Sequence, residues 1–96
     1  MIYAYLMHMD IEWDSNKAGS NLKKHGVSFE EAVTALLDPR ALAQEDTRSE
    51  TEARWVLIGM SSRPRLLTIV YTLRDGERIR LISARRATRN EASYYA

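Results

Sequence analysis

The stretch from Ser28 to Pro39 constrains the fold more than any other part of the sequence. Ser28 and Glu31 have the spacing of a capping box, and the residue before Pro39 is disfavoured in a helix, so a helix is predicted between these two signals. Its apolar residues recur with the period of a buried stripe: Phe29, Ala32, Val33, Leu36 and Leu37. We interpret these side chains as part of the core.

A second, weakly amphipathic helix is predicted just before it, from about Asn16 to His25. Asp14 or Ser15 is its N-cap, and Gly26 supplies the left-handed residue beyond its end. The helical period places two sets of residues on separate faces, an apolar set of Ala18, Leu22 and His25 and a polar set of Lys17, Asn21 and Lys24. A short extended segment at 11–13 precedes this helix.

After Pro39 the pattern changes to that of strands. Four strands are predicted, at residues 41–45, 54–60, 66–73 and 78–84. Residues 61–65 and 75–76 link antiparallel neighbours as hairpins, and Thr88 with Glu91 opens a short C-terminal helix. The predicted fold class is therefore α+β, with an antiparallel meander sheet flanked by an N-terminal helix pair and a short C-terminal helix.

The 96 residues have the length of a single domain. The patterned sequence begins at residue 9, so residues 1–8 are either an N-terminal extension of a domain at 9–96 or part of it. The apolar start has no basic flank and no cleavage site, so we expect a cytoplasmic protein without a signal peptide or membrane contact. With no Cys and two His, thiolate and multi-histidine metal sites are excluded, and we expect neither a metal nor another cofactor.

The net charge of +1 hides two halves of opposite sign. Residues 1–53 carry five basic and ten acidic residues, a net −5, whereas residues 54–96 carry nine arginines and three acidic residues, a net +6. Arginine matches phosphate oxygens in a bidentate geometry, which favours a surface that binds a polyanion. A solvated sheet face whose arginines pair with the acidic half explains the same pattern, and the charges alone do not separate these interpretations.

Several individual side chains also have two interpretations. His25 follows two lysines at a helix end, where it is either a structural residue favoured by the helix dipole or a general acid or base. Tyr94 and Tyr95 either stack on a nucleobase or close the core. Trp13 and Trp55 are interpreted as core residues.

Several collinear motifs resemble those of the BrnT family, bacterial toxins of type II toxin–antitoxin pairs. In chain order they are EWD at 12–14 followed by Lys17 and Asn21, KHGVSFEEA at 24–32, DP at 38–39, Ile58 and Gly59 with Ser61, RLL at 65–67, YT at 71–72 and IRLISARRAT at 79–88. The resemblance implies a fold like that of RelE-type ribonucleases. It also implies a toxin that cleaves RNA and blocks translation and growth, and a small BrnA-like antitoxin whose ribbon-helix-helix part binds operator DNA, so that only the complex contacts DNA.

Metal-free RNA cleavage must activate the 2′-hydroxyl, stabilise the phosphorane and protonate the 5′-oxygen. We expect Arg80 and Arg85 to hold the phosphate, with Arg65 as a further clamp, and Lys24 or His25 to transfer protons. The further residues expected to bind RNA are Lys17, Arg63, Arg78 and Arg86. The alternative is a non-catalytic or inactivated module that binds nucleic acid or antitoxin and has a regulatory role.

Overall fold

A computed structural model of the chain describes residues 2–6, 9–47, 52–75 and 77–95. The strands are β1 (Ile2–Leu6), β2 (Met9–Trp13), β3 (Leu42–Asp46), β4 (Arg54–Met60), β5 (Leu66–Arg74) and β6 (Arg78–Arg86), and the helices are α1 (Ser15–His25), α2 (Phe29–Leu36) and α3 (Arg89–Ala92). The predicted helices and the four strands after Pro39 are confirmed to within about two residues at each end. Gly76, the second residue of the predicted tight turn, lies outside the described residues.

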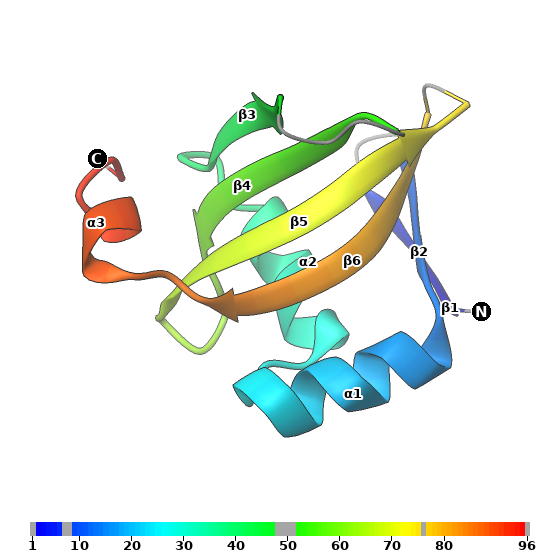
Figure 1. Ribbon diagram of the computed structural model, residues 1–96, viewed down its shortest axis with the longest axis horizontal. Helices are drawn as coiled ribbons and strands as arrows, with labels where there is room; N and C mark the ends of the chain where they lie inside the picture. Colours follow the sequence, from blue (N-terminus) through cyan, green and yellow to red (C-terminus); the bar gives the residue numbers. More distant parts are fainter. Residues whose placement is uncertain (1, 7–8, 48–51, 76, 96) are drawn as a thin grey trace.

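The strands form one six-stranded sheet in the order β1-β2-β6-β5-β4-β3 (Figure 1). The meander from β3 to β6 is antiparallel, as predicted. The prediction of a wholly antiparallel sheet is wrong, because β2 pairs in parallel with β6, with Ile11 opposite Ile79. This pairing joins the first half of the chain to its last strand, and unlike a hairpin it leaves no local turn signal in the sequence. The strand β1, which the sequence analysis did not assign, pairs with β2 as a hairpin neighbour.

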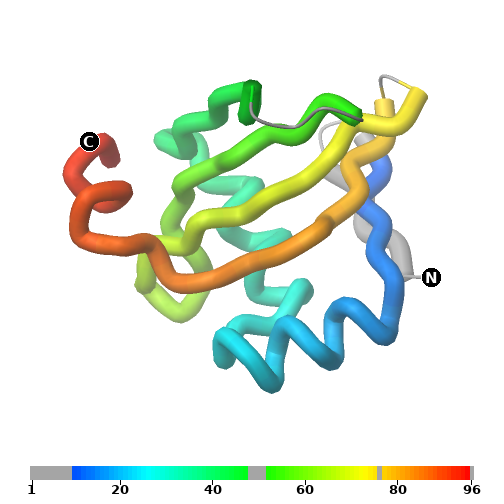
Figure 2. Tube along the Cα trace, viewed as in Figure 1, coloured from blue at the N-terminus to red at the C-terminus, as the bar shows by residue number. Residues whose placement is uncertain are grey.

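The core lies between the sheet and α2, which runs behind the central strands in the view of Figure 2. Alternation along β5 and β6 directs Leu67, Ile69 and Leu81 into this core, where they are almost fully buried. The ring of Trp13 meets that of Phe29 edge to face, with 5.9 Å between centroids. Helix α2 approaches β4 so closely that a Cβ on Gly59 would lie 2.5 Å from the carbonyl oxygen of Ala35, which explains why a glycine stands there.

The N-caps of the helices are those that the sequence predicts. Asp14 caps α1, Ser28 caps α2, and Gly26 ends α1 with a positive φ of 70°. At α3 the capping box of Thr88 and Glu91 is complete. At α2 only half of the box forms, because the Glu31 side chain binds elsewhere while its backbone N–H donates to Ser28.

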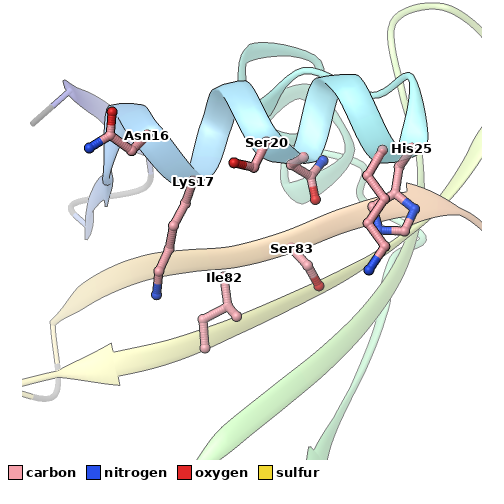
Figure 3. A pocket seen from close by; sticks show the side chains of 8 residues that line it. Asn16, Lys17, Ser20, His25, Ile82 and Ser83 are labelled. Carbon is pink, nitrogen blue, oxygen red and sulfur yellow. The ribbon is translucent and has the colours of Figure 1, made fainter.

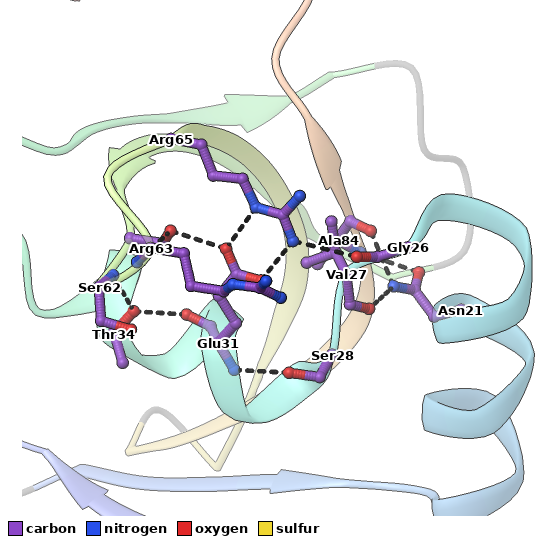
Figure 4. Close-up of polar contacts among 11 residues, drawn as sticks. Asn21, Gly26, Val27, Ser28, Glu31, Thr34, Ser62, Arg63, Arg65 and Ala84 are labelled. Atoms are coloured by element: carbon purple, nitrogen blue, oxygen red, sulfur yellow. Dashed lines mark hydrogen bonds and ion pairs between the residues drawn. The ribbon is translucent and has the colours of Figure 1, made fainter.

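Helix α1 lies along β6 beyond the point where β2 stops pairing with it (Figure 1). The Asn21 amide takes the place of a neighbouring strand there. Its oxygen accepts a hydrogen bond from the Ala84 N–H at 3.0 Å, and its nitrogen donates to the carbonyl oxygens of Ala84 at 2.8 Å and Val27 at 2.9 Å (Figure 4). Asn21 is therefore buried, whereas Leu22 of the predicted apolar stripe is 51% exposed.

Hydrogen bonds hold the C-terminal segment against the rest of the molecule. The Tyr95 hydroxyl donates to the carboxylate of Asp38, which also accepts from the backbone N–H groups of Met60 and Arg40. These hydrogen bonds, the one from Tyr95 first, lower the pKa of Asp38, and the Asp38 carboxylate raises the pKa of Tyr95. Tyr94 points elsewhere and is 67% exposed. No helix in the described ranges is both long enough and apolar enough to cross a bilayer.

Candidate functional site

A groove of about 390 Å³ runs between α1 and β6, and we call it the basic groove. Its lining residues are Asn16, Lys17, Ser20, Asn21, Lys24 and His25 of α1 with Ile82 and Ser83 of β6. Figure 3 shows Lys17 and His25 toward the two ends of the groove, with Ile82 and Ser83 between them on the strand. Three of the predicted site residues, Lys17, Lys24 and His25, therefore meet at one place.

The geometry of the basic groove follows from the helical period and from the contacts of Asn21. Lys17, Asn21 and Lys24 share the predicted face of α1, and the buried amide of Asn21 fixes that face against β6. Of the described side chains that line the groove, two are lysines and none is acidic. The charge of such a lining favours an anion, and a histidine and two serine hydroxyls lie along the same groove.

Arg65 occupies a different place, in an ion pair with the buried carboxylate of Glu31 on α2. Its Nε and Nη2 donate to the two carboxylate oxygens at 2.7 and 2.6 Å, and the Ser61 hydroxyl donates to the same carboxylate at 2.7 Å (Figure 4). The hydrogen bond from Arg65 is the main cause that lowers the pKa of Glu31. Nη2 of Arg65 also donates to the carbonyl oxygen of Gly26 at 3.0 Å, next to His25 in the chain. Arg65 thus ties α2 and the β4–β5 hairpin to the end of α1.

Arg85 lies at the far end of β6 and pairs with Glu91 of α3. Both nitrogens of the guanidinium fork donate to the carboxylate, at 2.7 and 2.8 Å. Glu91 also accepts from the Thr88 N–H and the Thr68 hydroxyl. With the bond from Arg85 as the largest cause, these contacts hold the pKa of Glu91 at about 2, well below its ordinary value of 4.5.

This shift predicts a loss of stability in acid. Because the pKa of Glu91 is lower in the folded protein than in the unfolded chain, its contribution is complete above about pH 4.5 and declines as the pH falls toward 2. In urea titrations at pH 7 and pH 3, we expect Glu91→Gln to lose less stability between the two pH values than the wild type. Glu30→Gln, at an exposed glutamate of α2, is the matched control and should follow the wild type. An equal pH dependence in Glu91→Gln and the wild type would contradict this assignment.

Arg78 and Arg80 lie near the start of β6, around the buried carboxylate of Glu12. The Arg80 and Arg78 nitrogens approach it at 3.5 and 3.9 Å. They border a hollow of about 530 Å³ that Glu52 and Asp75 also line, so its charges are mixed. The side chains of Arg80 and Arg85 both lie on the face of β6 opposite the core. They are separated along the strand, because Arg80 pairs with Thr72 of β5 and Arg85 pairs with Thr68, four residues away.

The structure therefore brings together only some of the predicted site residues. Lys17, Lys24 and His25 line the basic groove. Arg65 and Arg85 each pair with a separate carboxylate, and Arg80 shares the carboxylate of Glu12 with Arg78. Arg63 on the β4–β5 hairpin and Arg86 at the end of β6 are exposed. Their roles in RNA binding and catalysis stay predictions.

The polar residues that complete these arrangements were not predicted as site residues. Ser20 and Ser83 line the basic groove, although neither was predicted as a site residue: Ser20 lies outside the quoted motifs, and Ser83 lies within the motif at 79–88. Glu31 was interpreted only as half of a capping box, although it is the partner of Arg65. The pairing of Glu91 with Arg85 leaves a partial signal in the sequence, because Arg85 ends a strand only six residues before Glu91.

Comparison with known proteins gives a consistent result. Residues 13–91 match the family model described as ribonuclease toxin, BrnT, of type II toxin–antitoxin system. Among solved structures, the chain is similar to the crystal structure of the Brucella abortus ribonuclease toxin BrnT, with a TM-score of 0.64 and 23% sequence identity over 82% of this chain and 96% of that one. At 23% sequence identity, this similarity shows that the two proteins share a fold. A search of curated protein sequences gave no match.

Proposed function

The chain belongs to the BrnT family of type II ribonuclease toxins, and we propose that it is a metal-independent endoribonuclease whose cleavage of RNA inhibits translation and growth. The observation that carries this proposal is the basic groove. It joins two lysines, a histidine and two serines, without an acidic side chain among the described residues of its lining. RNA is the polyanion that a ribonuclease must hold, and cleavage by its own 2′-hydroxyl needs proton transfer and charge stabilisation, both of which these side chains supply.

In the proposed reaction the scissile phosphate lies in the basic groove between α1 and β6. The 2′-hydroxyl oxygen attacks phosphorus and loses its proton to a base, while the bond to the 5′-oxygen breaks and that oxygen gains a proton. Lys24 and His25 are the groups that we assign to these two transfers. The charge of Lys17 and the protonated form of Lys24 stabilise the negative charge that develops on the phosphorane oxygens.

The arginines extend this site. Arg85 follows Ser83 by two residues and so shares its face of β6. Its two bonds to Glu91 hold the guanidinium in one orientation, and a fixed donor loses little free energy in reorganisation when it binds phosphate. We assign Arg80 and Arg65 as further phosphate contacts, with Arg63, Arg78 and Arg86 along the path of the RNA.

The partners follow from the type of system. We propose a BrnA-like ribbon-helix-helix antitoxin that covers the basic groove in the resting cell, and operator DNA that is bound only by the complex. The proposed setting is the cytoplasm, where RNA and antitoxin are both available. The fold relationship to RelE-type ribonucleases belongs to the same proposal.

The experiment that tests the function is induced expression with growth followed, together with incubation of the purified protein and labelled RNA in EDTA. Growth arrest and RNA fragments that form in EDTA are the expected results, and Arg80→Ala combined with Arg85→Ala should lower both. Intact RNA with normal growth would reject the proposal in favour of a binding module. In that case affinity for RNA should fall steeply with salt while RNA length stays constant.

A further inference from the structure

The sheet ends in an open strand on the side away from α1. Strand β3 is the last in the sheet order, and among the described residues it pairs only with β4, so its outer edge offers backbone N–H and C=O groups to another chain. Four of its five residues are exposed. No proline lies inside the strand to block a further pairing.

A groove of about 730 Å³ lies along this strand, and we call it the edge groove. Its floor is apolar, because Leu42 of β3 and Val56 and Ile58 of β4 line it, and Tyr94 stands at its rim. Leu42 is 43% and Tyr94 67% exposed. Exposed apolar side chains gathered in one hollow beside a free strand edge are typical of a surface that binds a partner.

The charges of the edge groove oppose those of the basic groove. Its charged lining residues are Glu45 and Asp46, and no lysine or arginine is among the described side chains that line it. A phosphate backbone would be repelled there, whereas a peptide with lysine or arginine beside its apolar residues would be attracted. The charges therefore favour a protein segment over RNA.

From these observations we propose that the edge groove binds an extended segment of the antitoxin, which adds to the sheet as a strand beside β3. Alternate residues of that segment are apolar and fill the hollow over Val56 and Ile58, and its flanking residues are basic and meet Glu45. Main-chain hydrogen bonds to β3 supply affinity, and the groove supplies specificity. This proposal rests on membership of a type II toxin family and not on the ribonuclease chemistry, since the edge groove shares no lining residue with the basic groove.

Binding of the purified antitoxin to the full-length toxin tests the proposal. Leu42→Lys places a positive charge in the groove, and Tyr94→Ala removes an aromatic contact, so each should weaken antitoxin binding by about tenfold or more in calorimetry. Leu22→Lys is the matched control, because Leu22 is equally exposed but lies on α1 outside both grooves, and it should bind like the wild type. All three side chains are exposed, so the variants should fold.

Amide hydrogen exchange gives a second measurement that needs no variant. Strand addition should slow exchange at the outer-edge amides of β3 when the antitoxin is bound. Wild-type affinity in Leu42→Lys and Tyr94→Ala, or protection confined to α1 and β6, would overturn the proposal, as would protection of β3 by RNA alone. RNA cleavage by the free variants is assayed separately, so that a failure of the ribonuclease proposal is not mistaken for a failure of this one.

Discussion

Replacement of both Lys24 and His25 by alanine is expected to lower the rate of RNA cleavage by about 10²- to 10⁴-fold, the usual contribution of positioned acid–base groups. Both side chains line the basic groove, so the change removes the groups assigned to proton transfer. Neither is part of the buried core. The fold should therefore persist, and initial rates with labelled RNA, measured beside thermal unfolding, check the prediction.

Lys23→Ala is the control for the charge that this variant loses. Lys23 is a neighbour of Lys24 on the same helix and is exposed, but it does not line the basic groove. Its removal should leave the cleavage rate close to that of the wild type. If Lys23→Ala and the double variant lost activity to the same degree, general basicity of α1 and not the groove would be responsible.

Asn21→Ala is expected to destabilise the folded protein by about 2 to 4 kcal/mol. The substitution leaves the N–H and C=O of Ala84 and the C=O of Val27 without the hydrogen bonds that the amide makes, and each unpaired buried polar group costs about 1 to 3 kcal/mol. Urea unfolding followed by circular dichroism measures the loss.

The neighbouring residue supplies a sharp comparison. Leu22 is about half exposed, so Leu22→Ala should change stability by no more than about 0.5 kcal/mol. The helical pattern alone predicts the opposite order, with the leucine in the core and the asparagine on a polar face. A larger loss in Leu22→Ala than in Asn21→Ala would show that α1 packs by the sequence pattern and not as the structure has it.

Elements set by short-range signals could be predicted from the sequence. Ser28, Thr88 and Gly26 mark helix ends because their own side chain or backbone conformation satisfies the end of the helix. The alternation in β5 and β6 identifies the core face for the same reason, since the period of a strand is a local property. From these signals the helices, the antiparallel meander and the packing of α2 against the sheet could be predicted.

Features that depend on distant partners could not be predicted in this way. The parallel pairing of β2 with β6 and the amide of Asn21 at Ala84 join residues more than sixty positions apart. In the candidate site, Lys17 and Lys24 could be grouped because they share a predicted face of one helix. His25 was predicted on the other face, yet it lines the same groove. The carboxylate that lies beside each arginine could not be predicted, because the sequence does not show which acidic residue the fold brings next to a given basic one.

The place of β6 in the sheet has a consequence for how the protein is made. This strand lies between β2 and β5 although it is the last of the six to be synthesised. Until residues 78–86 have left the ribosome, the β1–β2 hairpin and the strands β3 to β5 have no shared sheet, and α1 has no strand against which to form the basic groove. The candidate RNA-binding site therefore cannot form on a nascent chain that has not yet exposed β6.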